Sequence, residues 1–335
     1  MLKTTVSIFI LALALLFNGC GTKRQYFKSD SVEGSIKSSG SLSSSLKEVM
    51  RNGASSKDGS IITLKGVENS VQLEKGYSFF GEFDNKFITI SPVGEIHVKN
   101  SNNLLLHTLN LNAMIASASM DGETLAAVTS DNMLYLADIN TGYVFFQKKM
   151  DNMAAVDSRI AAPYFLGSLV IFPTLDGKLA IVDKNTQTIV NSVVVSGERE
   201  FNNIIFLDVL GDRMFAATAK RIIAINSDGG INFMDEEIKD AVVADERVFI
   251  FTKDGKIFLC DLELRVLSEK KFPFAIFAGV SADKKLYILE KMGYLIKSDL
   301  ELKEFEIFKF PSKIDDFLFI AKDKIFYKDN FYVLE

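Results

Sequence analysis

The sequence predicts an all-β fold made of repeated sheets of about four strands each. Short runs of β-branched and aromatic residues recur along the chain and are separated by turn-forming residues. No long stretch has the 3.6-residue period of an amphipathic helix. The clearest copy is residues 124–149. Three strands are expected there, at residues 124–128, 133–137 and 143–148. The residues between them are rich in Asn, Asp and Gly, which tolerate the positive φ of hairpin turns.

The turn between the first two strands of this copy recurs along the chain. We call one residue near the end of this turn, Asn132 in this copy, the marker residue. Seven marker residues are present: Gly94, Asn132, Gly177, Lys220, Gly255, Gly293 and Asn330. They lie 35 to 45 residues apart, and a period of about 40–45 residues is typical of propeller blades. A single sheet cannot bury both of its faces alone, whereas radial stacking buries each sheet against its neighbours. The sequence therefore predicts a single β-propeller of four-stranded blades.

The seven markers predict seven blades, in a ring that is closed by an N-terminal strand. The last copy, residues 313–335, has room for only three strands. Residues 58–64, DGSIITL, are typical of a strand but lack a full blade of their own. We expect this strand to supply the missing outer strand of the last blade. Eight blades are the alternative, if residues 58–75 form a separate blade.

Residues 138–146, DINTGYVFF, resemble the D-x-x-T-G-x-x-x-W signature of pyrroloquinoline-quinone-type propeller repeats. Three residues match the signature: Asp138, Thr141 and Gly142. Phe146 stands at the place of the Trp. The resemblance covers roughly residues 58–335, and it implies the same propeller architecture.

The resemblance does not extend to the residues that quinone enzymes use. Such enzymes commonly hold their cofactor with a Trp floor, a disulfide between adjacent Cys residues and a calcium site. This sequence has no Trp and only two Cys, at positions 20 and 260. We therefore expect no catalytic residue, no cofactor and no metal, and a quinone-dependent dehydrogenase is the least favoured function.

The other reactive side chains give no catalytic pattern. Cys260 lies in the apolar run KIFLC and is expected to be a buried strand residue. His97 and His107 are expected on neighbouring strands, but two histidines cannot supply the three or four ligands of a zinc site. No G-x-S-x-G or P-loop motif is present.

Residues 1–19 are predicted to be a lipoprotein signal peptide. Lys3 precedes the apolar residues 6–17, whose helix would be about 18 Å long, too short to cross a bilayer core of about 30 Å. The following FNGCG resembles the lipobox of bacterial lipoproteins, in which the Cys becomes diacylated and N-terminal. The resemblance implies a lipid on Cys20. No Asp follows Cys20, which favours the periplasmic face of the outer membrane over the inner membrane.

The segment between the signal and the propeller, residues 20–57, is expected to be a flexible tether. Residues 31–57 are rich in Ser, Gly and Lys and contain no aromatic residue. Such a composition buries too little surface to order itself. The propeller is then expected at residues 58–335.

Charge and loop positions limit the partners. The formal net charge of −5 and the lack of a basic cluster argue against nucleic acid, whose binding needs Lys and Arg. The end of the chain, residues 303–332, alternates charged and aromatic residues, as one-sided or edge strands do. An edge that accepts a partner strand is the less favoured alternative. Three loops are candidates for contact surfaces, because propeller loops carry function: residues 151–163, 196–203 and 311–316.

A lipid-anchored propeller with quinone-type repeats and no catalytic set resembles the BamB family, accessory lipoproteins of the outer-membrane β-barrel assembly machine. The resemblance implies a periplasmic scaffold that binds the barrel-inserting subunit, BamA, and unfolded outer-membrane proteins. The alternative is another envelope lipoprotein that binds a protein or a sugar.

Overall fold

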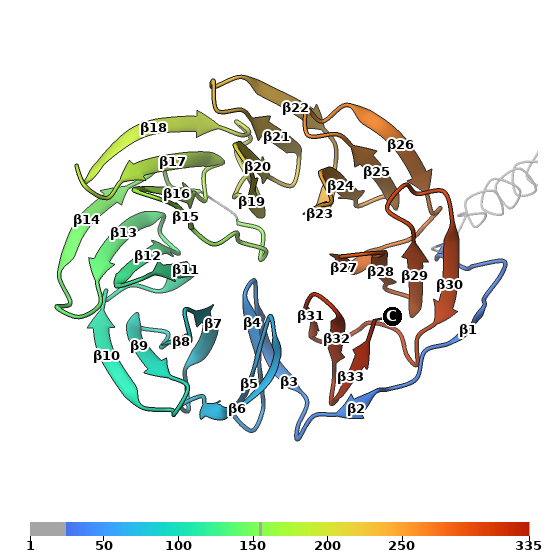
Figure 1. Ribbon diagram of the computed structural model, residues 1–335, viewed down its shortest axis with the longest axis horizontal. Coiled ribbons are helices and arrows are strands. Elements are labelled where there is room, and N and C mark those ends of the chain that lie inside the picture. The colour runs from blue at the N-terminus through green and yellow to red at the C-terminus, as the bar shows by residue number, and fades with distance from the viewer. Residues whose placement is uncertain (1–24, 154–155, 335) are drawn as a thin grey trace, which may run out of the picture.

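In the residues that the structure describes, 25–153 and 156–334 of a computed structural model, eight β-sheets stand in a closed ring (Figure 1). These residues form strands, turns and irregular segments and contain no α-helix. The first strand of each blade lies nearest the axis, and the later strands follow outward. The predicted all-β propeller is therefore confirmed.

The strands of the first four blades follow one another in chain order. Blade 1 contains β3 (Leu46–Met50), β4 (Gly53–Ser56), β5 (Ser60–Thr63) and β6 (Gly66–Gln72). Blade 2 contains β7 (Ser78–Phe83), β8 (Lys86–Ile90), β9 (Glu95–Asn100) and β10 (Leu105–Asn110). Blade 3 contains β11 (Ile115–Asp121), β12 (Thr124–Thr129), β13 (Met133–Asp138) and β14 (Val144–Lys149). Blade 4 contains β15 (Tyr164–Leu166), β16 (Leu169–Pro173), β17 (Lys178–Asp183) and β18 (Thr188–Val194).

Blades 5 and 6 also follow chain order, whereas blades 7 and 8 each include a strand from the N-terminal part of the chain. Blade 5 contains β19 (Phe206–Leu210), β20 (Arg213–Ala217), β21 (Arg221–Ile225) and β22 (Ile231–Asp235). Blade 6 contains β23 (Ile238–Ala244), β24 (Arg247–Thr252), β25 (Lys256–Cys260) and β26 (Val266–Lys271). Blade 7 contains β27 (Phe277–Ala282), β28 (Leu286–Glu290), β29 (Tyr294–Ser298), β30 (Phe305–Lys309) and, outermost, β1 (Gly34–Ser35). Blade 8 contains β31 (Leu318–Ile320), β32 (Lys324–Tyr327), β33 (Asn330–Val333) and, outermost, β2 (Gly40–Ser41).

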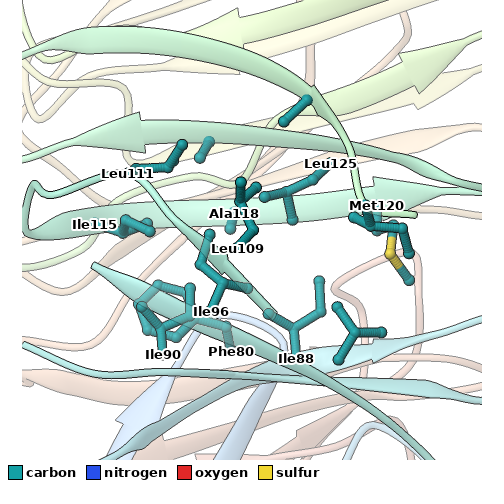
Figure 2. Packing of buried hydrophobic residues seen from close by; sticks show 14 residues of the cluster. Phe80, Ile88, Ile90, Ile96, Leu109, Leu111, Ile115, Ala118, Met120 and Leu125 are labelled. Atoms are coloured by element: carbon teal, nitrogen blue, oxygen red, sulfur yellow. The ribbon is translucent and has the colours of Figure 1, made fainter. Parts of the chain in front are cut away.

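Hydrophobic clusters fill the seams between neighbouring blades, one cluster for each of the eight seams in the described part of the chain. The seam between blades 2 and 3 holds 14 buried residues, among them Ile88, Ile96 and Leu125 (Figure 2). The seam between blades 1 and 2 holds four, including Phe79 and Phe87. Full burial of such a side chain contributes about 1.5–3 kcal/mol. The inter-blade packing therefore holds the ring together.

The marker turn connects the second and third strands of a blade, and it is tied to the linker that leaves the same blade. In blades 1 to 7 the residue directly after the outer strand donates its backbone N–H to the carbonyl of the marker residue, at 2.8–3.2 Å. Leu111 donates to Gly94 in this way at 3.0 Å. In blade 1 Leu73 donates to Gly59 at 2.9 Å, and the φ of Gly59, 89°, matches the 88° of Gly94. Gly59 is therefore an eighth marker.

The prediction of seven blades is wrong, and the alternative of eight is correct. Residues 58–64 do not complete the last blade, because β5 pairs with β4 on one edge and with β6 on the other. An N-terminal strand does close the ring, as predicted. That strand is β2, whose Gly40 and Ser41 pair antiparallel with Phe331 and Asn330 of β33.

Residues 25–42, which we call the strap, run along the outside of blades 7 and 8 (Figure 1). β1 pairs in parallel with β30. On either side of it the backbone N–H groups of Glu33 and Ile36 donate to carbonyls of β30 at 2.8 Å. The side chain of Phe27 is buried in the seam between blades 6 and 7, edge-on to Phe272 and Tyr294 at ring-centroid distances of 5.9 and 5.3 Å.

The predicted flexible tether is therefore wrong for residues 25–57, and the propeller begins well before residue 58. The strap is held by backbone pairing with β30 and β33 and by the buried side chain of Phe27. Backbone pairing needs no apolar side chains, so the Ser- and Gly-rich composition of residues 31–57 did not reveal the strands. β4, with the sequence GASS, is buried throughout although it is small and partly polar. The predicted signal peptide, residues 1–19, and the lipidation site, Cys20, lie outside the described residues.

Candidate functional site on the linker face

The marker turns and the linkers between blades share one face of the ring, because they are hydrogen-bonded to each other; we call it the linker face. All three candidate loops named from the sequence are linkers on this face. The linkers and marker turns also carry exposed large apolar side chains: Val93, Met114, Phe201, Phe274 and Phe317, each between 48% and 67% exposed. Exposed apolar side chains also occur on the opposite face, Leu104 and Tyr143 among them, so these five are candidate contact points that need further evidence from their surroundings.

The described residues of the two longest linkers, 150–153 and 156–163 in the first and 195–205 in the second, form a platform over blades 3 to 5. The buried amide of Asn203 connects them. Its Oδ1 accepts the backbone N–H of Asp157 at 2.7 Å, and its Nδ2 donates to the carbonyl of Arg159 at 2.7 Å. Because these bonds are shielded from water, the platform holds one shape.

Two further Asn residues fix the platform to the marker turns beneath it. The Nδ2 of Asn132 donates to Asp151 O at 2.7 Å and to Asp176 Oδ1 at 2.9 Å, which joins the turns of blades 3 and 4. The Nδ2 of Asn202 donates to the carbonyls of Asp176 and Ser196, at 3.0 and 2.8 Å. Both Asn side chains are buried.

Phe201 projects from the platform. It is 51% exposed, and its φ of 53° lies in the left-handed region, which is unusual for a bulky residue. The preceding Glu198, Arg199 and Glu200 are also exposed. An apolar side chain beside charges of both signs has the composition of a protein–protein contact.

The inner strands enclose a central channel with a cavity of about 640 Å³. Its lining includes three cationic residues, Arg51, Arg159 and Lys239, and the acidic residue Asp240. Arg159 lies 2.5 Å from Asp157 of the platform, and Arg51 lies 3.6 Å from Asp240. The Arg159 guanidinium also donates to the carbonyl of Lys239. The platform and the channel mouth are thus one connected structure.

Burial and neighbouring charge shift the pKa values of the channel groups. Burial lowers the pKa of Lys239, and the nearby Arg159 lowers it further. Burial raises the pKa of Asp208, which lies near Arg51. Burial alone would raise the pKa of Asp157, but the hydrogen bonds from Arg159 outweigh it and lower this pKa. Two of the cationic groups of the channel are paired with carboxylates, Arg159 with Asp157 and Arg51 with Asp240.

The repeat-signature residues Asp138, Thr141 and Gly142 have a structural role, in the turn between β13 and β14 on the opposite face. Asp138 Oδ1 accepts the backbone N–H and the hydroxyl of Thr141, at 2.8 and 2.9 Å. The N–H of Gly142, at a φ of 71°, donates to the carbonyl of Asp138 at 2.9 Å. Phe146, in the Trp position, is buried in the seam between blades 3 and 4.

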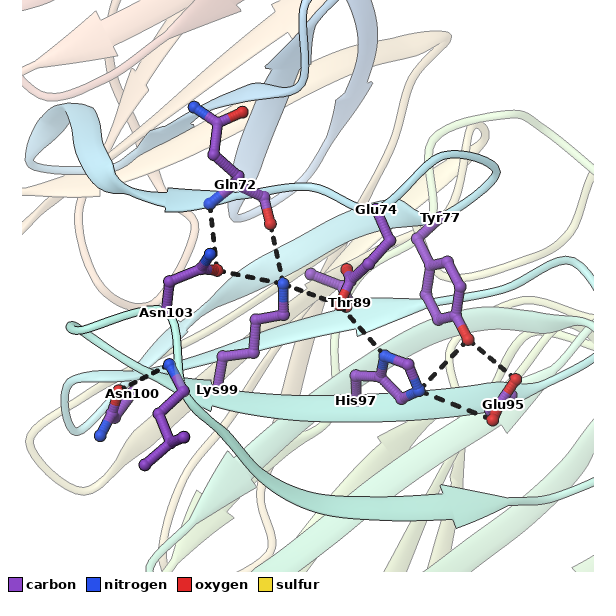
Figure 3. A network of polar contacts seen from close by, with 10 residues as sticks. Gln72, Glu74, Tyr77, Thr89, Glu95, His97, Lys99, Asn100 and Asn103 are labelled. Carbon is purple, nitrogen blue, oxygen red and sulfur yellow. Dashed lines mark hydrogen bonds and ion pairs between the residues drawn. The ribbon is translucent and has the colours of Figure 1, made fainter.

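His97 and His107 lie on the adjacent strands β9 and β10 of blade 2. His97 belongs to a polar cluster at the junction with blade 1 (Figure 3). Its Nδ1 lies 3.2 Å from Glu74, and its ring stacks on Tyr77 at 4.6 Å. The buried Lys99 lies 2.7 Å from Glu74 and donates to the carbonyl of Gln72 at 2.8 Å. This cluster supplements the small apolar seam between blades 1 and 2.

Cys260 is fully buried in β25, as predicted, and burial raises its thiol pKa to about 12. In the described part of the chain no group of three or more His, Cys, Asp and Glu residues could hold a metal ion. Nor does this part contain a helix with the length and apolar character needed to cross a membrane.

Known proteins resemble this chain first in fold. The crystal structure of BamB from Moraxella catarrhalis superposes with a TM-score of 0.70 at 12% identity, covering 87% of this chain and 96% of that one. The fold is that of BamB. The C-terminal WD40 domain of Sif2 superposes with a TM-score of 0.69 at 15% identity, covering 91% and 99%. The BamB-like architecture expected from the sequence is thus confirmed at the level of fold.

Sequence comparison gives a second group of relatives. The plasminogen-binding protein PgbB of Helicobacter pylori is 29% identical over 313 residues in strain J99 and 28% identical over 315 residues in strain 26695. These matches cover 79% and 80% of this chain. The chain spans just under three-fifths of the length of these curated relatives, 57% and 58%. No family model matches the chain.

The sequence located the candidate linkers but not the residues that fix them. Arg159, Asn202 and Asn203 were not singled out, although all three lie in or next to the candidate loops. The available signal was the Asn-Asn pair before the apolar run at residue 204, because Asn is a common side-chain cap for loop backbone.

Proposed function

We propose that this chain is a lipid-anchored, periplasmic protein-binding propeller that uses the platform over blades 3 to 5 to hold a partner at the outer membrane. One observation carries the proposal. The two longest linkers are locked together by buried Asn203, and they present the exposed Phe201 beside charges of both signs. A fixed surface with an aromatic centre and a charged rim suits a protein partner, because little ordering cost remains on binding.

The partner that we propose first is the barrel-inserting subunit of the outer-membrane assembly machine, with unfolded outer-membrane proteins as its clients. The BamB-like fold supports this choice, as does the lipobox-like sequence around Cys20, which would place the protein at the outer membrane. In this proposal the chain is a scaffold and not an enzyme.

The test is site-specific photo-crosslinking in cells, with a photoreactive residue in place of Phe201. Tyr143, 65% exposed on the opposite face, is the matched control position. We expect an adduct with the barrel-inserting subunit from position 201 and none from position 143. Adducts with other envelope proteins alone would defeat the assembly role.

A second candidate function is plasminogen binding, favoured by the name of the 29%-identical relatives. Binding of purified plasminogen to the full chain tests it. If the same platform is used, Phe201→Ser should weaken binding and Tyr143→Ser should not.

A further inference from the structure

The strap joins the propeller at the linker face, beside blades 6 to 8. Phe27 is buried in the seam between blades 6 and 7, whereas Tyr26 is 52% exposed. Tyr26 lines a cavity of about 320 Å³ together with Phe274 and Met292. Phe274 lies in a linker and Met292 in a marker turn, so Tyr26, which directly follows the first described residue, lies at this face.

Three exposed aromatic side chains surround this point; we call Tyr26, Phe274 and Phe317 the aromatic patch. They are 52%, 55% and 48% exposed. A second hollow of about 540 Å³ shares Lys291 and Ile314 with the first and extends to Phe317. The three aromatic side chains therefore line two adjoining hollows, which extend over the linkers on both sides of blade 7.

Phe274 is poorly suited to its own backbone. Its φ of 64° lies in the left-handed region, where Gly or Asn is the favoured residue. More than half of this side chain is exposed, so burial of the ring offsets the strain only in part. Strain of this kind concentrates at contact sites.

The surroundings of the patch suit a lipid surface. Lys291 and Lys313 are exposed and line the first hollow. A Lys side chain at a membrane can keep its ammonium group among the lipid headgroups while its methylene groups lie deeper. Among the nearby acids, Asp315 is paired with Lys328 at 3.1 Å, whereas Asp316 is exposed. Attraction to anionic lipid is therefore modest, and the aromatic groups would provide most of the contact energy.

The few residues between Cys20 and Tyr26 limit how far Tyr26 can lie from a membrane that holds a lipid on Cys20. Cys20 precedes Gln25, the first described residue, by five Cα–Cα steps. Five steps span at most about 18 Å when fully extended. A lipid on Cys20 would therefore hold Tyr26 close to the membrane, which the long tether expected from the sequence would not do.

We propose that the aromatic patch rests in the interfacial layer of the membrane that holds the Cys20 lipid. This inference depends on the proposed lipidation. The propeller is then a disc that leans on the bilayer with blades 6 to 8. The platform over blades 3 to 5 lies across the channel on the same face, so it is turned toward a partner embedded in that membrane.

The test uses the full-length lipidated protein in vesicles of phosphatidylethanolamine and phosphatidylglycerol that contain a spin-labelled quencher lipid. An environment-sensitive dye is attached at Phe274→Cys, and in a second variant at Phe317→Cys. The matched control is Tyr143→Cys on the opposite face. Cys260 does not compete for the dye, because it is fully buried and its pKa is raised to about 12.

We expect quenching at positions 274 and 317 to exceed that at position 143 at least about threefold, because interfacial contacts lie within about 5–10 Å of the headgroup boundary. Equal quenching at all three positions, in protein that carries lipid and floats with the vesicles, would overturn the patch and leave the anchor intact. Mature protein that lacks lipid on Cys20 and does not float would overturn both.

Discussion

The linker face has two sectors of different construction. The platform over blades 3 to 5 consists of long linkers held by buried Asn side chains, with one exposed Phe. The sector over blades 6 to 8 has shorter linkers, three exposed aromatic residues and the entry point of the strap. One ring thus carries a polar, locked sector, which we assign to a protein partner, and an aromatic sector, which we assign to lipid. The inner strands keep the two sectors at a fixed relative position.

The largest expected effect is on the strap. Phe27→Ala removes a buried ring from the seam between blades 6 and 7 and should lower the free energy of unfolding by about 3–5 kcal/mol. Urea denaturation of the purified chain measures this change. Lys28→Ala, one residue away and exposed, is the control and should change stability by less than about 0.5 kcal/mol. Equal effects would show that the strap is not held by Phe27.

The second-largest effect on stability is expected from Asn203, whose side chain holds the platform together. Asn203→Ala leaves the backbone N–H of Asp157 and the carbonyl of Arg159 without their partner, at a cost of about 1–3 kcal/mol for each unsatisfied group. Crosslinking from position 201 should fall, while vesicle contact at Phe274 should not change. Loss of both would contradict the independence of the two sectors.

A substitution at Gly177 tests the packing beneath the platform more specifically than removal of the Asn203 side chain does. A Cβ on Gly177 would lie 2.1 Å from Asn202 Nδ2 and 2.7 Å from Ser196 O. Gly229 has nearly the same φ, 84° against 83°, but open space around its Cβ. Gly229→Ala should therefore cost about 1 kcal/mol in backbone strain, and Gly177→Ala about 1–3 kcal/mol more. Thermal unfolding of both variants gives the difference, and equal costs would contradict close packing under the platform.

The two sectors should also respond to pH with opposite sign. Asp157 of the platform has a lowered pKa in the folded chain, so its stabilisation is present above its ordinary value of 3.8 and is lost as the pH falls through the folded value. Glu290, fully buried beneath the aromatic patch, has a pKa raised by burial, so its charge destabilises the fold at neutral pH.

Glu290→Gln should therefore stabilise the chain at pH 7, and the gain should vanish as the pH falls through the raised pKa toward 4.5. Asp157→Asn should destabilise it at pH 7 by about 1.5 kcal/mol, with the loss fading below pH 3.8. Urea midpoints between pH 3 and 8 measure both. The same sign for both variants would show that the environments of the two carboxylates have been misassigned.

The fold was predictable to the extent that its repeats share a turn. Five of the eight blades carry Ser or Thr three residues before the marker: Ser56, Ser91, Thr129, Thr174 and Thr252. Applying that pattern to Ser56 and Gly59 would have revealed blade 1. The strap could not be found in this way, because its order comes from backbone pairing with strands almost 300 residues away. The platform was found only as loop positions, since the bonds of Asn203 join segments 46 residues apart.

The central claim is that the two sectors of the linker face touch different things. Photo-crosslinking in cells from positions 201 and 274 of the otherwise unchanged full-length protein, with each adduct identified by mass spectrometry, tests it most directly. The account predicts protein adducts from position 201 and lipid adducts from position 274. Lipid from position 201, or protein alone from position 274, would contradict it.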